Sequence, residues 1–168
     1  MQVHLSSDSP PPASRPVFMV DDQEFDRMRF TRLLCDAGAS NPCHTFSRGE
    51  DLIDALIGVL RGAPAPLLCF IDVKMAGMNG FDVLRWIRCQ HACNEIPVVM
   101  LSSSDEPRDV GEALHCGAQC YVAKFPRVDQ LSMILQEAER VAVCLAADPF
   151  RLPCNLLLPV AQALCRTT

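Results

Sequence analysis

The chain has 168 residues, which corresponds to one domain with at most a short appendage. Hydrophobic residues make up 49% and charged residues 21% of the chain, a composition typical of a globular protein that excludes global disorder. The formal net charge of −5 excludes a strongly basic surface, so we expect no binding to nucleic acid through phosphate contacts.

Residues 1–15 are predicted to form a disordered tail, because the segment is polar and rich in proline. The segment has neither the basic region nor the apolar region of a secretory signal. No apolar run in the chain is long enough to span a membrane as a helix. We therefore expect a cytoplasmic protein whose ten cysteines are reduced thiols.

Five short apolar runs follow the tail, and each is predicted to form a β-strand. They cover residues 17–20, 43–46, 67–71, 97–101 and 119–123. Runs that are apolar throughout are typical of strands buried on both faces, as in a parallel sheet.

Helical periodicity fills the gaps between these runs. A first apolar stripe ends before Gly38, and a second follows a capping-box pattern at residues 47–50. A third helix is predicted from about Asn79-Gly80, a fourth from residues 105–107 to Gly117, and a fifth along residues 128–145. Five alternating strands and helices predict an α/β fold with a doubly wound, five-stranded parallel sheet over residues 16–146.

Candidate site residues follow four of the five apolar runs. Asp21 and Asp22 follow the first run, Asp72 the third, residues 102–104 (all serine) the fourth, and Lys124 the fifth. Ligands of such sheets bind at the carboxyl ends of the strands, so we expect these groups to converge.

Three carboxylates in one crevice repel one another and favour a bound cation. Oxygen ligands without thiolate or imidazole groups favour Mg²⁺. Beside that cation, Asp72 could act as the nucleophile of a phosphoryl transfer and form an acyl phosphate. Ser102 could then donate a hydrogen bond to a phosphoryl oxygen, and Lys124 could place a positive charge beside it.

These motifs resemble those of the receiver domain of response regulators in two-component signalling, and especially its stand-alone, chemotaxis-regulator-like members. The resemblance covers residues 16–146 and rests on residues 18–22, 70–75 with 78–80, 97–103, and 117–124. It implies a flavodoxin-like (βα)₅ receiver fold with a short C-terminal extension. It also implies that Asp72 is the phosphoacceptor, that Mg²⁺ binds Asp21, Asp22, Asp72 and the backbone carbonyl of Lys74, and that Ser102 and Tyr121 are the switch residues beside Lys124.

The chain departs from the family pattern at several positions. Ala76 stands where the family usually has proline, and Phe125 separates Lys124 from the proline that usually follows it directly. Ser103 replaces the more common alanine. Lys74 and Ser104 occupy the two positions that tune the lifetime of the acyl phosphate in this family.

The leading hypothesis is a single-domain response regulator rather than an enzyme. A sensor histidine kinase or a phosphotransfer protein would donate the phosphoryl group, and a downstream protein would read the phosphorylated state. An aspartyl-phosphate hydrolase is an alternative, but such enzymes have a second aspartate where this chain has Lys74. A flavodoxin-like electron carrier is disfavoured because Asp21 and Asp22 would repel a flavin phosphate. A degenerate receiver that acts as an unphosphorylated scaffold is the third alternative.

Two further segments could carry a site or an interface. Residues 147–168 are rich in aliphatic side chains and are predicted to fold back on the domain or to form the arm of a homodimer. They are too few for a DNA-binding output domain, so we expect output through protein contacts at the fourth and fifth helices and the fifth strand. Cys89, His91 and Cys93 could hold a metal, but without a second cluster they are interpreted as the end of a helix.

Overall fold

The computed structural model describes residues 15–103 and 107–147. Five parallel strands form one sheet in the order β2-β1-β3-β4-β5. The strands are β1 (Val17–Val20), β2 (Cys43–Phe46), β3 (Leu68–Asp72), β4 (Val98–Ser102) and β5 (Cys120–Ala123). This arrangement confirms the predicted α/β class and the doubly wound parallel sheet.

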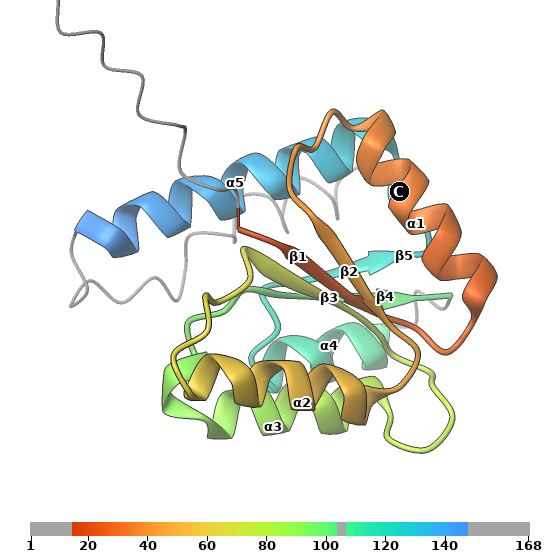
Figure 1. The fold of residues 1–168 in the computed structure, drawn as a ribbon. Helices are drawn as coiled ribbons and strands as arrows, with labels where there is room; N and C mark the ends of the chain where they lie inside the picture. Colours follow the sequence, from red (N-terminus) through yellow and green to blue (C-terminus); the bar gives the residue numbers. More distant parts are fainter. Residues whose placement is uncertain (1–14, 104–106, 148–168) are drawn as a thin grey trace, which may run out of the picture.

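Five α-helices connect the strands and cover both faces of the sheet. They are α1 (Glu24–Asp36), α2 (Gly49–Leu60), α3 (Gly80–Cys89), α4 (Pro107–His115) and α5 (Val128–Ala147), with a short 3₁₀ turn at His91–Cys93. In Figure 1, α1 and α5 lie on one face, and α2, α3 and α4 lie on the other.

Each face of the sheet has its own hydrophobic core. Under α1 and α5, the rings of Phe30 and Phe70 lie with their centroids 4.7 Å apart, and Leu131 and Leu135 of α5 join them. On the other side, the core is built from side chains of the sheet, α2 and α3, including Ile71, Leu52, Leu56, Leu84 and Ile87. These two cores fix the sheet between its helical layers and leave the carboxyl ends of the strands free to form a site.

The strands β3 and β4 end on polar residues that the apolar runs did not include. Asp72 closes β3 and Ser102 closes β4, and both side chains are buried. The backbone of these two site residues therefore belongs to the sheet, which fixes its position more firmly than a loop would.

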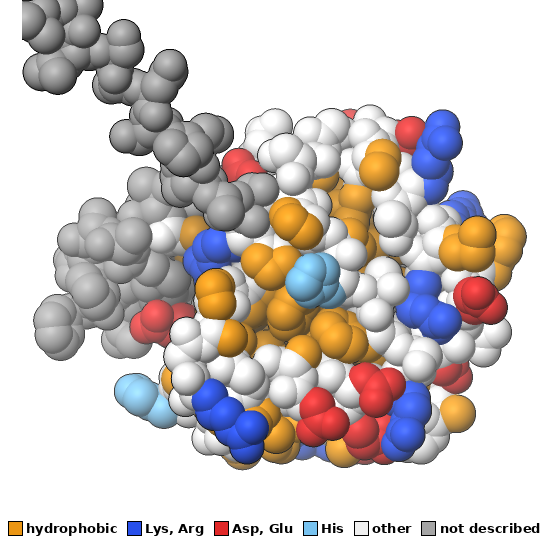
Figure 2. Space-filling view, viewed as in Figure 1, with side chains coloured by type: hydrophobic (Ala, Val, Ile, Leu, Met, Phe, Trp, Pro, Cys, Tyr) orange, Lys and Arg blue, Asp and Glu red, His pale blue; other side chains and the backbone are white. Residues whose placement is uncertain are grey.

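The prediction of burial on both faces is wrong for β2. His44 and Thr45 are exposed, because β2 is an edge strand with a partner on one side. Figure 2 shows hydrophobic side chains gathered in the middle of this face, between α1 and α2.

The predicted capping box at the start of α2 is also wrong. Arg48, not Ser47, is the N-cap residue of α2, and no side chain caps the helix. Close packing fixes this end instead, since a Cβ atom on Gly49 would lie 2.7 Å from Cγ2 of Val83 in α3. The predicted start of α3 is confirmed, because Oδ1 of Asn79 accepts a hydrogen bond of 3.0 Å from the backbone amide of Asp82.

At the amino ends of β4 and β5, Arg88 joins several segments through its guanidinium group. Its nitrogens donate hydrogen bonds of 2.8–3.1 Å to the backbone carbonyls of Gly117, Asn94 and Ile96 and to Oε1 of Gln119. The same Oε1 accepts a hydrogen bond of 2.7 Å from the amide of Val98. Gly117 has a φ of +92°, and a Cβ atom there would lie 3.1 Å from this guanidinium group.

Most of both predicted terminal segments lies outside the described residues. Arg15, at the end of the N-terminal segment, donates hydrogen bonds of 2.9 and 2.7 Å to the carbonyls of Ala65 and Pro66. The possible dimer arm at residues 147–168 is described only at Ala147, and Ser104 is not described. Among the helices of the described ranges, none has the length and apolar character needed to cross a membrane.

Candidate functional site

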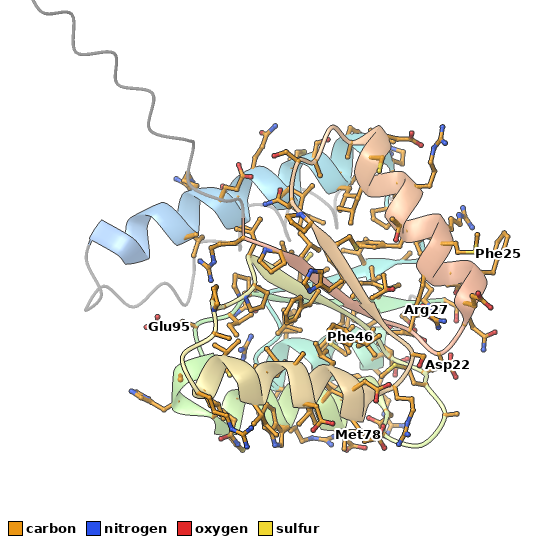
Figure 3. The ribbon with its side chains drawn as sticks, viewed as in Figure 1. Asp22, Phe25, Arg27, Phe46, Met78 and Glu95 are labelled. Carbon is orange, nitrogen blue, oxygen red and sulfur yellow. The ribbon has the colours of Figure 1, made fainter. Side chains whose placement is uncertain are left out.

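The parallel register brings four strand ends together at the carboxyl edge of the sheet. Asp21 directly follows Val20, which pairs with Ile71 of β3, and Asp72 pairs with Leu101 of β4. Carboxylate oxygens of Asp21, Asp22 and Asp72 all lie within 4.8 Å of one another. Figure 3 labels Asp22 and Arg27 at this end of the sheet and Glu95 at the opposite end.

The turn after β1 holds Asp21 in a fixed position. Its Oδ1 accepts a hydrogen bond of 2.9 Å from the backbone amide of Gln23, and its backbone carbonyl accepts one of 2.7 Å from Arg27. Its side chain is completely buried, whereas Asp22 is half-buried. The acidic pair therefore presents one rigid and one more accessible carboxylate.

Lys124 reaches into this cluster from the end of β5. Its Nζ lies 2.6 Å from Oδ2 of Asp21, 3.0 Å from Oδ2 of Asp26 and 3.1 Å from Oδ1 of Asp72. The side chain of Lys124 is only 10% exposed. One ammonium group thus contacts three carboxylates, and Asp22 adds a fourth negative group beside them.

Asp26 is a member of this cluster that the sequence interpretation did not single out. It lies in the first turn of α1 and ties Lys124 to that helix. An acidic residue one helical turn after the acidic pair is the available signal, but first-turn acids are common because they interact favourably with the helix dipole. Only the contact with Lys124 in the structure shows that Asp26 belongs to the site and is not simply an acid in the first turn of a helix.

The sequence left open the path of the segment after Lys124, where Phe125 precedes Pro126. The backbone amide of Lys124 donates a hydrogen bond of 2.7 Å to the carbonyl of Ser102, which ties this segment to β4. The peptide bond between Lys124 and Phe125 is cis, and the ring of Phe125 lies 4.6 Å from Cζ of Arg29. Lys124 therefore stays in register with Asp72 although Phe125 follows it.

The pKa values of the two central groups shift in the directions that their surroundings dictate. Burial raises the pKa of Asp72 to about 6; the charge of Lys124 opposes this rise and the charge of Asp21 adds to it. Burial alone would lower the pKa of Lys124, but its contacts with Asp21 and Asp26 and the charges of Asp72 and Asp21 raise it above its ordinary value. Lys124 is thus charged at neutral pH, and Asp72 ionises at a higher pH than an exposed aspartate.

This shift predicts a pH-dependent stability in the metal-free protein. Because the pKa of Asp72 rises from 3.8 to about 6 on folding, its contribution to stability is present below about pH 4 and is lost as the pH rises through about 6. Replacement of Asp72 by asparagine is expected to raise the free energy of unfolding by about 3 kcal/mol at about pH 8, with little change at about pH 4.

Urea unfolding of both proteins in the presence of a chelator measures this difference. Asp36→Asn is the control, because Asp36 is an exposed acid on α1 that pairs with Arg32 and should have a small effect at either pH. Equal stability of wild type and Asp72→Asn at about pH 8 would contradict the expectation that the ionised carboxylate of Asp72 destabilises the folded protein.

The donor set fits a hard divalent cation. Within the described residues, this trio is the one group of three or more His, Cys, Asp or Glu side chains placed to share a metal ion. Oδ2 of Asp21 is buried and accepts no well-aligned hydrogen bond, although the ammonium of Lys124 lies beside it. A buried carboxylate oxygen of this kind can accept a divalent cation as a further partner.

Helix α3 begins in direct contact with the end of β3. The amide of Gly80 donates a hydrogen bond of 3.1 Å to the carbonyl of Val73. A Cβ atom at position 80 would lie 2.2 Å from the backbone oxygen of Asp72, far inside van der Waals contact. Asp72 and the start of α3 can therefore lie this close together only because residue 80 is glycine.

The remaining predicted site residues lie at or near this edge. Ser102 is buried at the end of β4, one strand away from Asp72. Tyr121 is half-buried on β5 and packs against the core under α2, α3 and α4. Lys74 is exposed two residues after Asp72, and its backbone amide donates a hydrogen bond that lowers the pKa of the Asp72 carboxyl.

The cysteine and histidine residues at the end of α3 do not form a comparable cluster. Cys93 is completely buried in the core, whereas Cys89 and His91 are exposed. This placement agrees with their interpretation as the end of a helix.

Comparison with known proteins places this geometry in a family. Residues 17–136 match the profile described as "Response regulator receiver domain". The chain is 28% identical over 122 residues to the DNA-binding transcriptional regulator NtrC of Escherichia coli strain K12, and the alignment covers 73% of this chain and 24% of NtrC. It is 32% identical over 110 residues to the sensory/regulatory protein RpfC of Xanthomonas campestris pv. campestris, and this alignment covers 64% of this chain and 14% of RpfC.

Solved structures match over more of their own length. The bacteriophytochrome response regulator AtBRR superposes with a TM-score of 0.67 at 25% identity, over 77% of this chain and 95% of that chain. The Vibrio cholerae chemotaxis protein CheY4 superposes with a TM-score of 0.62 at 25% identity, over 75% of this chain and 99% of that chain. The chain therefore spans a small part of the two curated relatives and nearly the whole of these two structures.

Proposed function

The chain belongs to the response regulator receiver domain family of two-component signalling, and on that premise we propose that it accepts a phosphoryl group on Asp72 and signals through phosphorylation-dependent protein contacts. The observation that supports this proposal most strongly is the position of the Asp72 carboxylate. It lies against the ammonium of Lys124 and beside the two carboxylates of Asp21 and Asp22.

The proposed reaction is a phosphoryl transfer to a carboxylate. An oxygen of Asp72 attacks the phosphorus of a phosphohistidine, the P–N bond breaks, and the imidazole leaves with the bonding electron pair. A bound Mg²⁺, held by Asp21, Asp22, Asp72 and the backbone carbonyl of Lys74, would offset negative charge at the phosphoryl group.

Lys124 and Ser102 complete the site in this proposal. The ammonium of Lys124 already contacts Asp72, so it is placed to contact a phosphoryl oxygen on that side chain. The hydroxyl of Ser102 would donate a hydrogen bond to another phosphoryl oxygen, and Tyr121 would repack as the second switch residue. The contacts of Lys124 and Ser102 with the phosphoryl oxygens would favour the phosphorylated state, because they form only when the phosphoryl group is present.

Two of the alternative functions, the hydrolase and the scaffold, remain to be weighed and have less support. An aspartyl-phosphate hydrolase needs a second acid near the nucleophile to activate water, and the residue two positions after Asp72 is the exposed Lys74. A scaffold without phosphorylation would not need the buried charge cluster, which is costly to fold. We therefore propose a signalling role in which hydrolysis of the acyl phosphate is slow.

The proposed partners follow from this role. The phosphoryl donor would be a sensor histidine kinase or a phosphotransfer protein, and the output would be a contact with a downstream protein or a second copy of the chain. Leu114 of α4 and Val128 and Met133 of α5 are exposed hydrophobic residues, which supports the predicted output face at α4, β5 and α5. A cytoplasmic location also remains a prediction.

Phosphorylation by a small phosphodonor tests the proposed function. With Mg²⁺ and acetyl phosphate or phosphoramidate, intact-mass analysis should show one added phosphoryl group on wild type and none on Asp72→Asn. A chelator should suppress the product, because the clustered carboxylates repel an anionic donor. An adduct of equal yield on the asparagine variant would contradict the assignment of Asp72.

A further inference from the structure

The loop that follows β3 holds one of the metal-site carboxylates through its backbone. The amide N–H of Ala76 donates a hydrogen bond of 3.0 Å to Oδ2 of Asp22, a residue 54 positions earlier in the chain. Figure 3 shows Asp22 at the end of the sheet where this loop emerges. The bond therefore ties the loop after β1 directly to the loop after the phosphoacceptor strand.

This hydrogen bond depends on a departure from the family pattern. Receiver domains usually have proline at the position of Ala76, and proline has no backbone N–H to donate. Any other residue would supply the donor, so the bond depends on the absence of proline and not on the alanine methyl group.

Asp22 has fewer restraints than the other two acids of the site. Asp21 is buried and fixed by the amide of Gln23, and Asp72 is buried beside the ammonium of Lys124. In the described part of the chain, Asp22 forms no ion pair, and the second hydrogen bond to its carboxylate is a longer one of 3.3 Å from Nε2 of Gln23. The Ala76 amide is thus the main contact that orients this half-buried carboxylate.

We propose that the backbone amide of Ala76 is a positioning group for the divalent cation, because it holds Asp22 in the orientation that binds the metal. The inference rests on the proposed function of the site. A carboxylate oxygen has two lone pairs, so Oδ2 can keep this hydrogen bond while the carboxylate contacts a cation. Such outer contacts of ligand carboxylates orient them and strengthen metal binding. A side chain fixed before binding also loses less conformational entropy when the metal arrives.

Replacement of Ala76 by proline removes the backbone N–H that donates this hydrogen bond. In the full chain, the variant is expected to bind Mg²⁺ about three- to tenfold more weakly than wild type. This loss is small for a residue that orients a metal ligand, because the hydrogen bond is exposed to solvent. Ala76→Gly and Ala76→Ser keep the N–H and should bind Mg²⁺ within about twofold of wild type, by the same reasoning. Isothermal titration with Mg²⁺ measures all four affinities, and thermal unfolding in a chelator reports any separate loss of stability.

A proline variant that binds Mg²⁺ as tightly as wild type, or more tightly, would overturn the inference. So would an equal loss in the glycine and serine variants. If wild type binds Mg²⁺ and is phosphorylated on Asp72 while the proline variant matches it, only this inference fails. If wild type does not bind Mg²⁺, the proposed function fails with it.

Amide hydrogen exchange in the wild-type protein provides a second test that does not depend on how the proline variant folds. A positioning bond predicts that the Ala76 amide exchanges slowly without metal and stays slow when Mg²⁺ is added. Faster exchange on addition of Mg²⁺ would show that the bond is given up when the cation binds, and would overturn the inference.

Discussion

Replacement of Lys124 by methionine is expected to lower the free energy of unfolding of the metal-free protein by about 3 kcal/mol, because removal of one partner from a buried ion pair leaves uncompensated charge. Methionine keeps much of the length and apolar character of the side chain but has no charge. Without the ammonium, the carboxylates of Asp21, Asp26 and Asp72 lose a cation that contacts all three.

The same replacement is expected to strengthen Mg²⁺ binding. The ammonium of Lys124 and a divalent cation repel each other within one crevice, so its removal leaves more uncompensated negative charge for the metal. Mg²⁺ should therefore restore part of the lost stability. Phosphorylation of Lys124→Met should no longer drive partner binding, because the ammonium proposed to contact the phosphoryl oxygen is missing.

Urea unfolding with a chelator and with Mg²⁺, combined with Mg²⁺ titration, measures both effects. Lys74→Met is the matched control, because Lys74 is an exposed lysine two residues from Asp72 and its loss should leave stability nearly unchanged. A large loss of Mg²⁺ affinity in Lys124→Met would mean that Lys124 supports the metal site, contrary to the role assigned to it.

Replacement of Gly80 by alanine is expected to cost at least about 3 kcal/mol of stability, at the upper end of overpacking effects. The new Cβ atom would lie 2.2 Å from the backbone oxygen of Asp72 and 3.0 Å from Cα of Val73. These are backbone atoms of β3 and of the loop that follows it, so they cannot move aside as a flexible side chain could. Relief of the clash must shift α3 or the end of β3, and phosphorylation of Asp72 should fall with it.

Gly111→Ala is the control for this substitution. Gly111 lies within α4, and a Cβ atom there would meet nothing within 4 Å. Alanine at an open helical position should raise stability by about 0.5–1 kcal/mol. Chemical unfolding and the rate of phosphoryl incorporation are the measurements. Wild-type stability and rate in Gly80→Ala would show that the contact at Asp72 is not a constraint.

The main positions of the site could be predicted from the sequence because two simple patterns coincide. Apolar runs mark the buried strands, and the residues that follow them must lie at one edge when all strands are parallel. Asp21, Asp72 and Lys124 were located in this way, and the structure brings their side chains into contact. The regular alternation of strands and helices also predicted a parallel sheet, whereas the order of the strands within it was not predicted.

Other features depend on distances that no sequence pattern encodes. The contact of Asp26 with Lys124 needs the placement of α1 relative to β5, and the bond from Ala76 to Asp22 needs the approach of two loops. Local patterns also gave one wrong helix start, because tight packing of Gly49 against α3 fixes the beginning of α2. Local sequence therefore predicts the elements and their polar ends, whereas tertiary packing determines the contacts between them.

Chemical mapping of the phosphorylated residue tests the central claim most directly. Borohydride reduces an acyl phosphate to the corresponding alcohol, so an aspartyl phosphate becomes homoserine. After treatment with a phosphodonor and Mg²⁺, reduction and digestion, peptide mass spectrometry is predicted to find homoserine at position 72 and aspartate at positions 21, 22 and 26. Homoserine at any of these other positions, or a phosphorylated protein with unmodified Asp72, would contradict the assignment of Asp72 as the phosphoacceptor.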